Sequence, residues 1–533
     1  MLRARLSANS FDNPQLSILY NVSGPLQLVG NKEQQVEAMD QKNRDTIMTD
    51  YERIFHPQKL AIVGVSTEEG GTGFGSGMFT ALTAMGFEGE IFPVNPKGGK
   101  FLGTDIYRQV EDIPVKLDFA VICVTAKAVP DVLEACRKKG AAGAEILSAG
   151  FSELGTEAGL NLEKKICEIA AKGIRVVGPN CFGIYCPRSG LTLLPGPDLS
   201  RRSGPVAFLS QSGGMAIDFA HKGKWMGIGF SKVVSFGNGA DLRETELLRY
   251  LARDPETRII AMYIEGIKDG DAFFREVKAA SYRKPVIVCK GGLSPAGQRM
   301  VVSHTASMGG SRVIWQSVLR QVNAIQVQDL EELVEASLAF SLLPERVFKG
   351  ISVVVGGGAL GVTACDAAET FDIEIPPLSA DLQTRIGELL PKPGSSGLNP
   401  IDVASPFVEP KILKEILRIT AEGKQIDLQI IISLLYHYKT MARALGKPVA
   451  EVAPYRELAE AVRDVVKETG KPIVVVLANP KRGGDDLDIV EMLALARREF
   501  LDRGLPVFDE LHEAIRAIGH VNSYYGRRKA GNG

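Results

Sequence analysis

The chain has 533 residues, which is too long for one hydrophobic core and indicates three or four domains. A net charge of −1 gives no excess of positive charge for binding nucleic acid or an anionic membrane surface. No apolar run is long enough to cross a bilayer. Seven scattered cysteines form neither a metal-ligand spacing nor a disulfide framework, which fits a reducing cytoplasm.

Residues 1–50 are polar and lack clear periodicity, so we expect an N-terminal extension there. From there the chain alternates between short apolar runs, glycine-rich turns and helical stretches. This alternation predicts βαβ units with a parallel sheet, the arrangement of α/β proteins. The first block has predicted strands at 59–65, 91–94, 119–124, 144–147 and 175–177.

A linker rich in proline and glycine near 187–204 separates a second block, and the same pattern opens a third block. The chain therefore predicts three doubly wound domains, at 51–190, 191–345 and 346–520, followed by a tail at 521–533. The strands of the last two blocks are predicted at 206–209, 230–235, 259–264, 285–289, 350–355, 428–435 and 472–477.

A glycine-rich turn follows the first strand, with Gly64, Ser66 and Gly73 ahead of a helix. Its backbone N–H groups and the helix N-terminus are suited to hold a phosphate. The glycine spacing is wrong for a compact dinucleotide fingerprint, and the next strand ends in Asn95-Pro96-Lys97 instead of an acidic residue. A lysine there favours an additional phosphate, so coenzyme A fits better than NAD. The alternative is a turn that binds no ligand.

The segment Gly178-Pro179-Asn180-Cys181 follows the last strand of the first block and has the residues of a tight turn. The Asn180 amide could orient a carbonyl or a thiol. Cys181 has no base near it in the sequence, so a small buried residue is a better interpretation than a nucleophile.

The segment Ser210-Gln211-Ser212-Gly213-Gly214 joins a strand to a helix start. Its hydroxyl and N–H groups, together with the helix dipole, predict an anion site suited to a phosphate or a phosphohistidine. The segment also resembles a nucleophile elbow, but that motif requires glycine where Ser210 stands. Hydrolase chemistry is therefore the weaker interpretation.

Glu265 directly follows the strand at 259–264, at the sheet edge where parallel sheets bind their ligands. His304 lies in the segment 290–310, which has glycines on both flanks and predicts a mobile surface loop. A carboxylate that accepts the Nδ1 proton of His304 would leave Nε2 as a nucleophile. The alternatives are a solvated acid at a strand end and a solvated histidine on a loop.

In their order along the chain, these segments resemble the α subunit of NDP-forming acyl-CoA synthetases, the superfamily of succinyl-CoA synthetase and ADP-forming acetyl-CoA synthetase. The resemblance covers roughly residues 51–520. Each motif alone is weak, but the ordered set is specific. Besides the glycine turn, the set consists of Val94-Asn95-Pro96-Lys97, Ser148-Ala149-Gly150-Phe151, Gly178-Pro179-Asn180-Cys181, Ser210-Gln211-Ser212-Gly213-Gly214, Tyr263-Ile264-Glu265-Gly266, Ser303-His304-Thr305 and Gly397-Leu398-Asn399-Pro400-Ile401-Asp402.

The resemblance implies a Rossmann-like CoA-binding domain followed by two flavodoxin-like domains. It implies the reaction acyl-CoA + ADP + phosphate ⇌ carboxylate + ATP + CoA, through an acyl phosphate and then phosphorylated His304, with Glu265 orienting the imidazole. The phosphoryl group would be held by Gln211, Ser212, Gly213 and Gly214. The residues implied to bind CoA are Gly64, Ser66, Gly73, Asn95, Pro96, Lys97, Ser148 and Asn180.

Two departures from the family pattern bear on function. After Ser303-His304-Thr305 the family continues with Gly-Ala-Leu-Ala-Gly, whereas this chain has Ala306-Ser307-Met308-Gly309-Gly310. No segment reads as an ATP-grasp module, so we expect a separate β subunit to hold ADP or ATP with magnesium. The family implies an α₂β₂ assembly that acts on a small carboxylic acid and its acyl-CoA.

Two other classes of function compete with this interpretation. The first is a non-catalytic, CoA-binding regulatory protein with the same fold, which the altered residues after His304 leave open. The second is a hydrolase or acyltransferase that uses Ser212 or Cys181.

Overall fold

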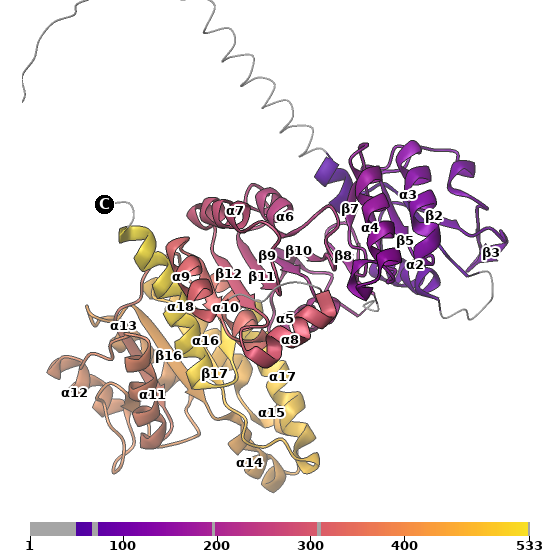
Figure 1. The fold of residues 1–533 in the computed structure, drawn as a ribbon. Coiled ribbons are helices and arrows are strands. Elements are labelled where there is room, and N and C mark those ends of the chain that lie inside the picture. Colours follow the sequence, from indigo (N-terminus) through magenta and orange to yellow (C-terminus); the bar gives the residue numbers. More distant parts are fainter. Residues whose placement is uncertain (1–49, 67–72, 195–197, 306–310, 531–533) are drawn as a thin grey trace, which may run out of the picture. The chain divides into compact units, whose positions relative to one another are not determined.

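A computed structural model describes residues 50–66, 73–194, 198–305 and 311–530. Figure 1 shows their helices and strands, coloured along the sequence. The side chains of 302–305 and of residue 530 lie outside this description, and so does almost all of the predicted extension at 1–50. No helix in the described ranges is both long enough and apolar enough to span a membrane.

The first sheet is parallel, with strand order β2-β1-β5-β6-β7. Its strands are near-continuous apolar runs because helices cover both faces. The strands are β1 (Lys59–Val63), β2 (Glu90–Val94), β5 (Phe119–Ile122), β6 (Gly143–Ile146) and β7 (Arg175–Val177). The helices are α2 (Phe74–Met85), α3 (Val129–Lys138) and α4 (Glu157–Ala170), with short turns η1 (Val110–Asp112), η2 (Ala126–Ala128) and η3 (Ser152–Leu154) and a hairpin of β3 (Lys100–Phe101) and β4 (Thr104–Asp105).

The second sheet has strand order β13-β12-β11-β9-β10-β8. Its parallel strands are β9 (Ser203–Ser210), β10 (Phe230–Ser235), β11 (Ile259–Ile264), β12 (Val286–Lys290) and β13 (Ile325–Val327). The edge strand β8 (Gly183–Tyr185) runs antiparallel to β10, which the sequence does not predict because three residues show no periodicity. The helices are α5 (Gly213–Trp225), α6 (Glu244–Leu251), α7 (Gly270–Arg283), α8 (Pro295–Thr305), α9 (Arg312–Gln321) and α10 (Leu330–Leu342).

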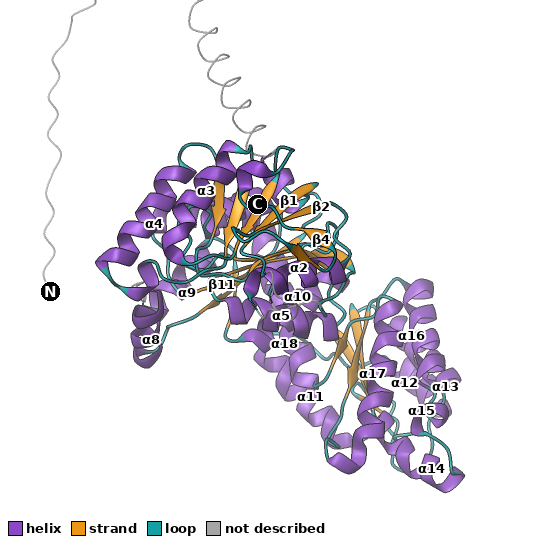
Figure 2. Ribbon diagram, turned by 90° about the vertical axis from the view of Figure 1, so that its right-hand side faces the viewer, coloured by secondary structure: helices purple, strands orange, loops and turns teal. Residues whose placement is uncertain are grey.

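The third sheet is parallel, with strand order β15-β14-β16-β17-β18. Figure 2 shows it between α11 and α18 on one face and α13, α16 and α17 on the other (Figure 2). The strands are β14 (Ile351–Val355), β15 (Ile401–Asp402), β16 (Leu428–Ser433), β17 (Ile473–Leu477) and β18 (Val507–Phe508). The helices are α11 (Gly358–Thr370), α12 (Ala380–Leu389), α13 (Pro410–Ala421), α14 (Tyr438–Leu445), α15 (Val449–Val452), α16 (Tyr455–Thr469), α17 (Leu487–Asp502) and α18 (Leu511–Ala530), with turns η4 (Leu435–His437) and η5 (Gly484–Asp486).

Two segments differ from their predictions. Most of the predicted loop at 290–310 is helix α8, because Ser294 accepts a hydrogen bond from the backbone N–H of Gly297 at 3.0 Å and Pro295 starts the first turn. Residues 306–310 lie outside the described residues. The predicted tail at 521–533 begins as the second half of α18. Tyr524 in this half is fully buried and donates to the Ser281 carbonyl at 2.7 Å, which joins α18 to the second domain.

In each sheet the chain goes from one central strand to the neighbour on one side and later to the neighbour on the other side. The central strand is β1 between β2 and β5, β9 between β10 and β11, and β14 between β15 and β16. Parallel sheets bind ligands beyond the carboxyl ends of their strands at such a switch point. In the third sheet the space beside Gly356 is only about 30 Å³, because Leu434, Leu435 and their neighbours fill it. The first two sheets are therefore where a site is expected.

Candidate functional site

Gln211 and Glu265 lie side by side at the switch point of the second sheet, where β9 and β11 end. The side-chain Oε1 atom of Gln211 accepts hydrogen bonds from the backbone N–H groups of Glu265 and of Gly266, the latter at 2.9 Å. Its amide group donates to the Gly266 carbonyl at 2.8 Å. Because Gln211 is buried and its amide binds the backbone on both sides, it fixes where the Glu265 side chain starts.

The Glu265 carboxyl group is buried, and its Oε2 atom finds no hydrogen-bond partner among the described residues. Burial and the adjacent Glu265 carboxyl raise the pKa of Tyr263. Lys290 donates to the Glu265 main-chain carbonyl at 2.7 Å, and burial lowers the pKa of this ammonium to about 8. A buried acceptor without a donor is costly in a folded protein, so Oε2 is positioned for a donor from elsewhere.

Ser212 caps helix α5 beside these residues. Its hydroxyl accepts the Met215 N–H at 3.4 Å, while the Ser210 hydroxyl donates to the Ser212 carbonyl at 2.6 Å. A Cβ atom on Gly213 would lie 2.8 Å from the Phe182 ring, so only glycine allows this close packing. The first-turn N–H groups of a helix have no partner within the helix and attract anions. Gly213 and Gly214 therefore form the first turn of a helix at the position where the sequence predicts an anion site.

His304 lies on the last turn of α8, and its side chain is outside the described atoms. Helix α8 contacts η3, a turn of the first domain. Helix α8, which carries His304, thus follows β12 of the second sheet and contacts the first domain.

The turn after β1 is built around Gly64, Asn95 and Ser66. Gly64 has φ of +107°, and its backbone N–H donates to the Val94 carbonyl at 2.9 Å. The Asn95 amide donates to the Val65 carbonyl at 2.7 Å, while its oxygen accepts the Lys97 N–H at 3.0 Å. Asn95 therefore shapes the turn. Of the other predicted CoA-binding residues nearby, Pro96 and Lys97 are exposed and Gly73 precedes α2 as its N-cap.

Ser148 and Asn180 meet beyond the carboxyl ends of β6 and β7, towards the β7 edge of the first sheet. Asn180 has φ of +55°, its backbone N–H donates to the Ser148 carbonyl at 2.9 Å, and the Ser148 hydroxyl donates to the Val124 carbonyl. The Asn180 amide lies 3.4 Å from Asn238 Oδ1, in the loop after β10. Asn180 therefore joins the strand ends of the first two sheets.

Two residues of this junction are missing from the sequence-based prediction, Glu153 and Asn238. The Asn238 amide donates to Glu153 at 2.6 Å and to Glu163 at 2.9 Å, and Glu153 also accepts the Gly150 N–H at 2.6 Å. Burial raises the pKa of Glu153, but these hydrogen bonds outweigh burial and lower it. Glu153 lies in η3, which α8 contacts. The signal in the sequence is slight: Glu153 lies two residues after the end of the Ser148–Phe151 motif.

Cys181 is buried, and its thiol lies 3.3 Å from the Ile146 carbonyl. Burial and the nearby Glu145 raise the pKa of this thiol, which keeps it protonated. Cys181 therefore has a packing role, in keeping with the preferred interpretation of the sequence.

Replacing Gly64 with alanine is expected to lower CoA affinity and to destabilise the first domain. The new Cβ would collide with the backbone carbonyl of Cys123, and φ of +107° is strained for any residue but glycine. The matched control is Gly270→Ala at the start of α7, because a Cβ there has nothing within 4 Å and the position lies outside the first domain. Calorimetric CoA titrations should show a loss for Gly64→Ala alone. Equal affinities for the two variants would contradict the assignment.

Glu145 lies beneath the Asn180 turn and predicts a pH effect on stability. Burial raises its pKa from 4.5 to about 8, although the Ile184 N–H at 2.9 Å opposes the shift. The folded protein therefore binds this proton more tightly than the unfolded chain. Its contribution to stability is complete below pH 4.5 and is lost as the pH rises to about 8.

Glu145→Gln should remove this dependence, because a neutral amide can still accept the Ile184 N–H. We expect the urea midpoints of the two proteins to agree near the acid end of this range and the variant to be more stable at the alkaline end. A difference between the two midpoints that stays constant with pH would contradict the assignment of this titration to Glu145.

Two family models match the chain. The CoA binding domain matches residues 58–187, and the succinyl-CoA ligase like flavodoxin domain matches residues 203–340. The first range contains the first sheet together with β8, and the second range contains the remaining strands of the second sheet.

Curated relatives extend over most of the chain. The α subunit of acetate–CoA ligase (ADP-forming) I from Pyrococcus furiosus is 33% identical over 88% of this chain and 96% of its own length. Acetate–CoA ligase (ADP-forming) I from Archaeoglobus fulgidus is also 33% identical over 89% of this chain, but the chain spans only 63% of its length. Thus one relative is matched almost completely and the other only in part.

A solved structure agrees with these relatives. Acetyl-coenzyme A synthetase 1 of Candidatus Korarchaeum cryptofilum, in complex with phosphate and ADP, superposes with a TM-score of 0.75 and 29% identity. The match covers 90% of this chain and 97% of that chain. The likeness therefore includes the third sheet, which lies beyond both family-model ranges.

Proposed function

This chain belongs to the NDP-forming acyl-CoA synthetase superfamily, and we propose that it is the CoA-binding, phosphohistidine-bearing part of an ADP-forming acyl-CoA synthetase. The reaction is acyl-CoA + ADP + phosphate ⇌ carboxylate + ATP + CoA. Phosphate attacks the thioester and releases CoA, and His304 then takes the phosphoryl group from the acyl phosphate and releases the carboxylate. Phosphohistidine finally transfers this group to ADP.

The observation that carries the proposal is the buried Oε2 atom of Glu265, which has no hydrogen-bond partner among the side chains that the structure describes. Gln211 fixes the backbone of Glu265, so this oxygen has a defined position at the strand ends. An imidazole N–H is a suitable donor, and a carboxyl group on Nδ1 leaves Nε2 free to attack phosphorus. The N-terminus of α5 beside it, with Ser212, Gly213 and Gly214, suits the negative charge of the phosphoryl group.

CoA fits the turn of the first domain. Gly64 leaves backbone space that a Cβ would fill, Asn95 shapes the turn, and the Lys97 ammonium is exposed for a phosphate. Ser148 and Asn180 lie where this domain meets the second sheet, which suits the thioester end of the ligand. The chain's own residues would thus bind the cofactor and orient its thioester towards the helix that carries His304.

We infer that a separate ATP-grasp β subunit holds ADP or ATP with Mg²⁺, in an α₂β₂ assembly. The almost complete match to a relative named as an α subunit supports a separate partner. In the longer relative, which this chain spans only in part, the module that corresponds to this partner would be in the same chain. All seven cysteines are free thiols, which supports a cytoplasmic location. The substrate is expected to be a small carboxylic acid and its acyl-CoA.

The test is transfer of phosphate from γ-labelled ATP to the chain in the presence of its ATP-grasp partner. We expect label that is stable in base and labile in acid, as for phosphohistidine, and its discharge by CoA with the carboxylate. A chain that never labels with its partner but still binds CoA would instead indicate a regulatory protein. Turnover of acyl-CoA without nucleotide would indicate a hydrolase.

Glu265→Gln should slow the labelling by about 10²-fold or more, because an amide no longer holds the imidazole in the reactive tautomer. CoA binding should stay unchanged, since Glu265 lies in the second domain. The labelling rate and the CoA affinity are measured on the same preparation. An unchanged labelling rate would remove Glu265 from the proposal.

A further inference from the structure

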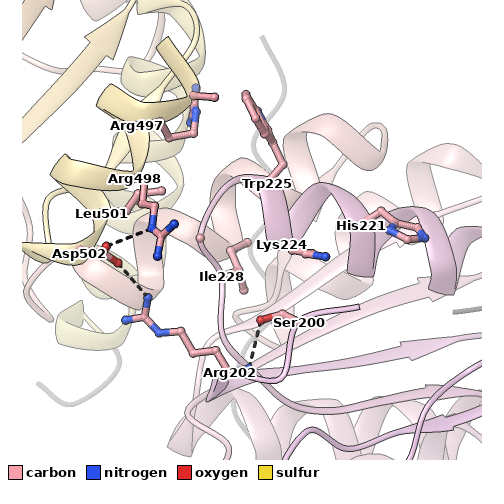
Figure 3. A pocket seen from close by; sticks show the side chains of 12 residues that line it. Ser200, Arg202, His221, Lys224, Trp225, Ile228, Arg497, Arg498, Leu501 and Asp502 are labelled. Atoms are coloured by element: carbon pink, nitrogen blue, oxygen red, sulfur yellow. Dashed lines mark hydrogen bonds and ion pairs between the residues drawn. The ribbon is translucent and has the colours of Figure 1, made fainter. Parts of the chain in front are cut away.

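A separate cavity of about 570 Å³ lies between the C-terminal half of α5 and helix α17 (Figure 3). It is lined from the second domain by residues such as Lys224 and Trp225, and from the third domain by residues such as Arg498 and Asp502. The proposed catalytic residues lie at the other end of α5, so this cavity is not part of that site. Its volume is that of a small-molecule pocket.

The lining of this cavity is cationic. Among the described residues that line it are four arginine or lysine side chains, His221 and a single carboxylate, Asp502. Arg202 and Arg498 both approach that carboxylate, at 3.8 and 3.6 Å (Figure 3). Both arginine side chains remain mostly exposed. Ion pairs of this length and exposure contribute little to stability. A ligand anion can therefore take the place of Asp502 as their partner at small cost.

The cavity also has an aromatic wall and an apolar floor. The indole of Trp225 is half exposed, and the buried Arg497 guanidinium lies 5.3 Å from its ring centre. Arg497 is held in place by hydrogen bonds to the Val507 carbonyl and to Asp509. The buried Ile228 and Leu501 form the floor. An exposed indole beside a held guanidinium and apolar side chains suits a planar ring.

We propose that this cavity binds a nucleoside phosphate. Its phosphates lie between Arg202, Lys224 and Arg498, and its base lies against Trp225. Guanidinium groups pair with phosphate oxygens in two parallel hydrogen bonds, which the two arginines can provide. The cavity is a site of this chain itself, separate from the CoA turn and from a nucleotide site on a partner.

The fluorescence of Trp225 provides a direct test, because the chain has only two tryptophans. The full chain with Trp315→Phe is titrated with ADP in the presence of saturating CoA, which occupies the CoA turn. ADP is expected to quench Trp225. Adding Lys224→Ala or Arg498→Ala should weaken ADP binding about ten-fold each, the usual effect of one charge-assisted hydrogen bond. Circular dichroism verifies that each variant is folded.

Lys222→Ala is the matched control, because Lys222 lies on the same helix but pairs with the exposed Glu331 outside the cavity. It should bind ADP like its parent. Adenosine and tripolyphosphate should each bind at least ten-fold more weakly than ADP, since each offers only half of the contacts. No quenching by ADP, equal effects of Lys222→Ala and Lys224→Ala, or tripolyphosphate binding as tight as that of ADP would each overturn the proposal.

Discussion

His304→Gln is expected to abolish the formation of ATP from acyl-CoA, ADP and phosphate, with a loss of at least about 10³-fold. Glutamine is close to histidine in size and polarity but cannot accept a phosphoryl group. The chain then has no carrier between the acyl phosphate and the nucleotide, so the overall reaction stops. The measurement is steady-state ATP formation by the chain with its ATP-grasp partner, together with labelling by γ-labelled ATP.

His512→Gln is the control, because His512 is exposed on α18 and packs only against the Phe371 ring, at 5.7 Å between ring centres, among the contacts described. It should keep the rate and the label of the unmodified chain. CoA binding by His304→Gln should also be unchanged, since the first domain holds that site. Label that persists in His304→Gln would show that another residue is phosphorylated and would end the assignment.

Lys232→Met is expected to destabilise the protein by about 3–5 kcal/mol, the usual result of breaking a buried ion pair. Lys232 lies on β10, is fully buried, and donates to Asp254 and Glu256 at 2.8 Å each. Methionine fills a similar volume but leaves the buried Asp254 carboxylate without its cation. The measurement is the free energy of unfolding from urea titrations followed by circular dichroism.

Lys222→Met gives the matched control. Its 2.6 Å pair with Glu331 is exposed, so its loss should cost about 0–1 kcal/mol. Adding Asp254→Asn to Lys232→Met should recover part of the stability, because the remaining buried group is then neutral. If the two single variants unfold at the same urea concentration, the buried pair has no special role.

The fold was largely predictable because long apolar strands with glycine turns leave a clear pattern. The strands β1, β9, β11 and β14 were all predicted from such runs, and their parallel pairing is confirmed. The same pattern placed Gln211 and Glu265 directly after two strands, and the sheet order brings them together. The prediction of NDP-forming acyl-CoA synthetase architecture is likewise confirmed.

The rest could not be predicted for two physical reasons. Asn238 and Glu153 are 85 residues apart, and only the packing of two domains brings them to 2.6 Å, so no local pattern marks them. Lys232 looks like the exposed position of a strand, but β10 is buried on both faces and the lysine pairs with two acidic residues from the loop between α6 and β11. Helix α8, by contrast, has a helix-start signal in Ser294 and Pro295. The glycines of this segment led to the prediction of a loop instead.

Helix α5 has 13 residues and so extends about 20 Å as one hydrogen-bonded rod. Ser212 and Gly213 lie at its first turn, and Lys224 and Trp225 lie at its last. A small tilt of this rod moves both ends together, in opposite directions about its middle. Occupancy of the proposed site at Trp225, if it tilts the rod, would therefore alter how well the proposed site at Gly213 holds a phosphoryl group, and thermodynamic reciprocity requires the same factor in the other direction.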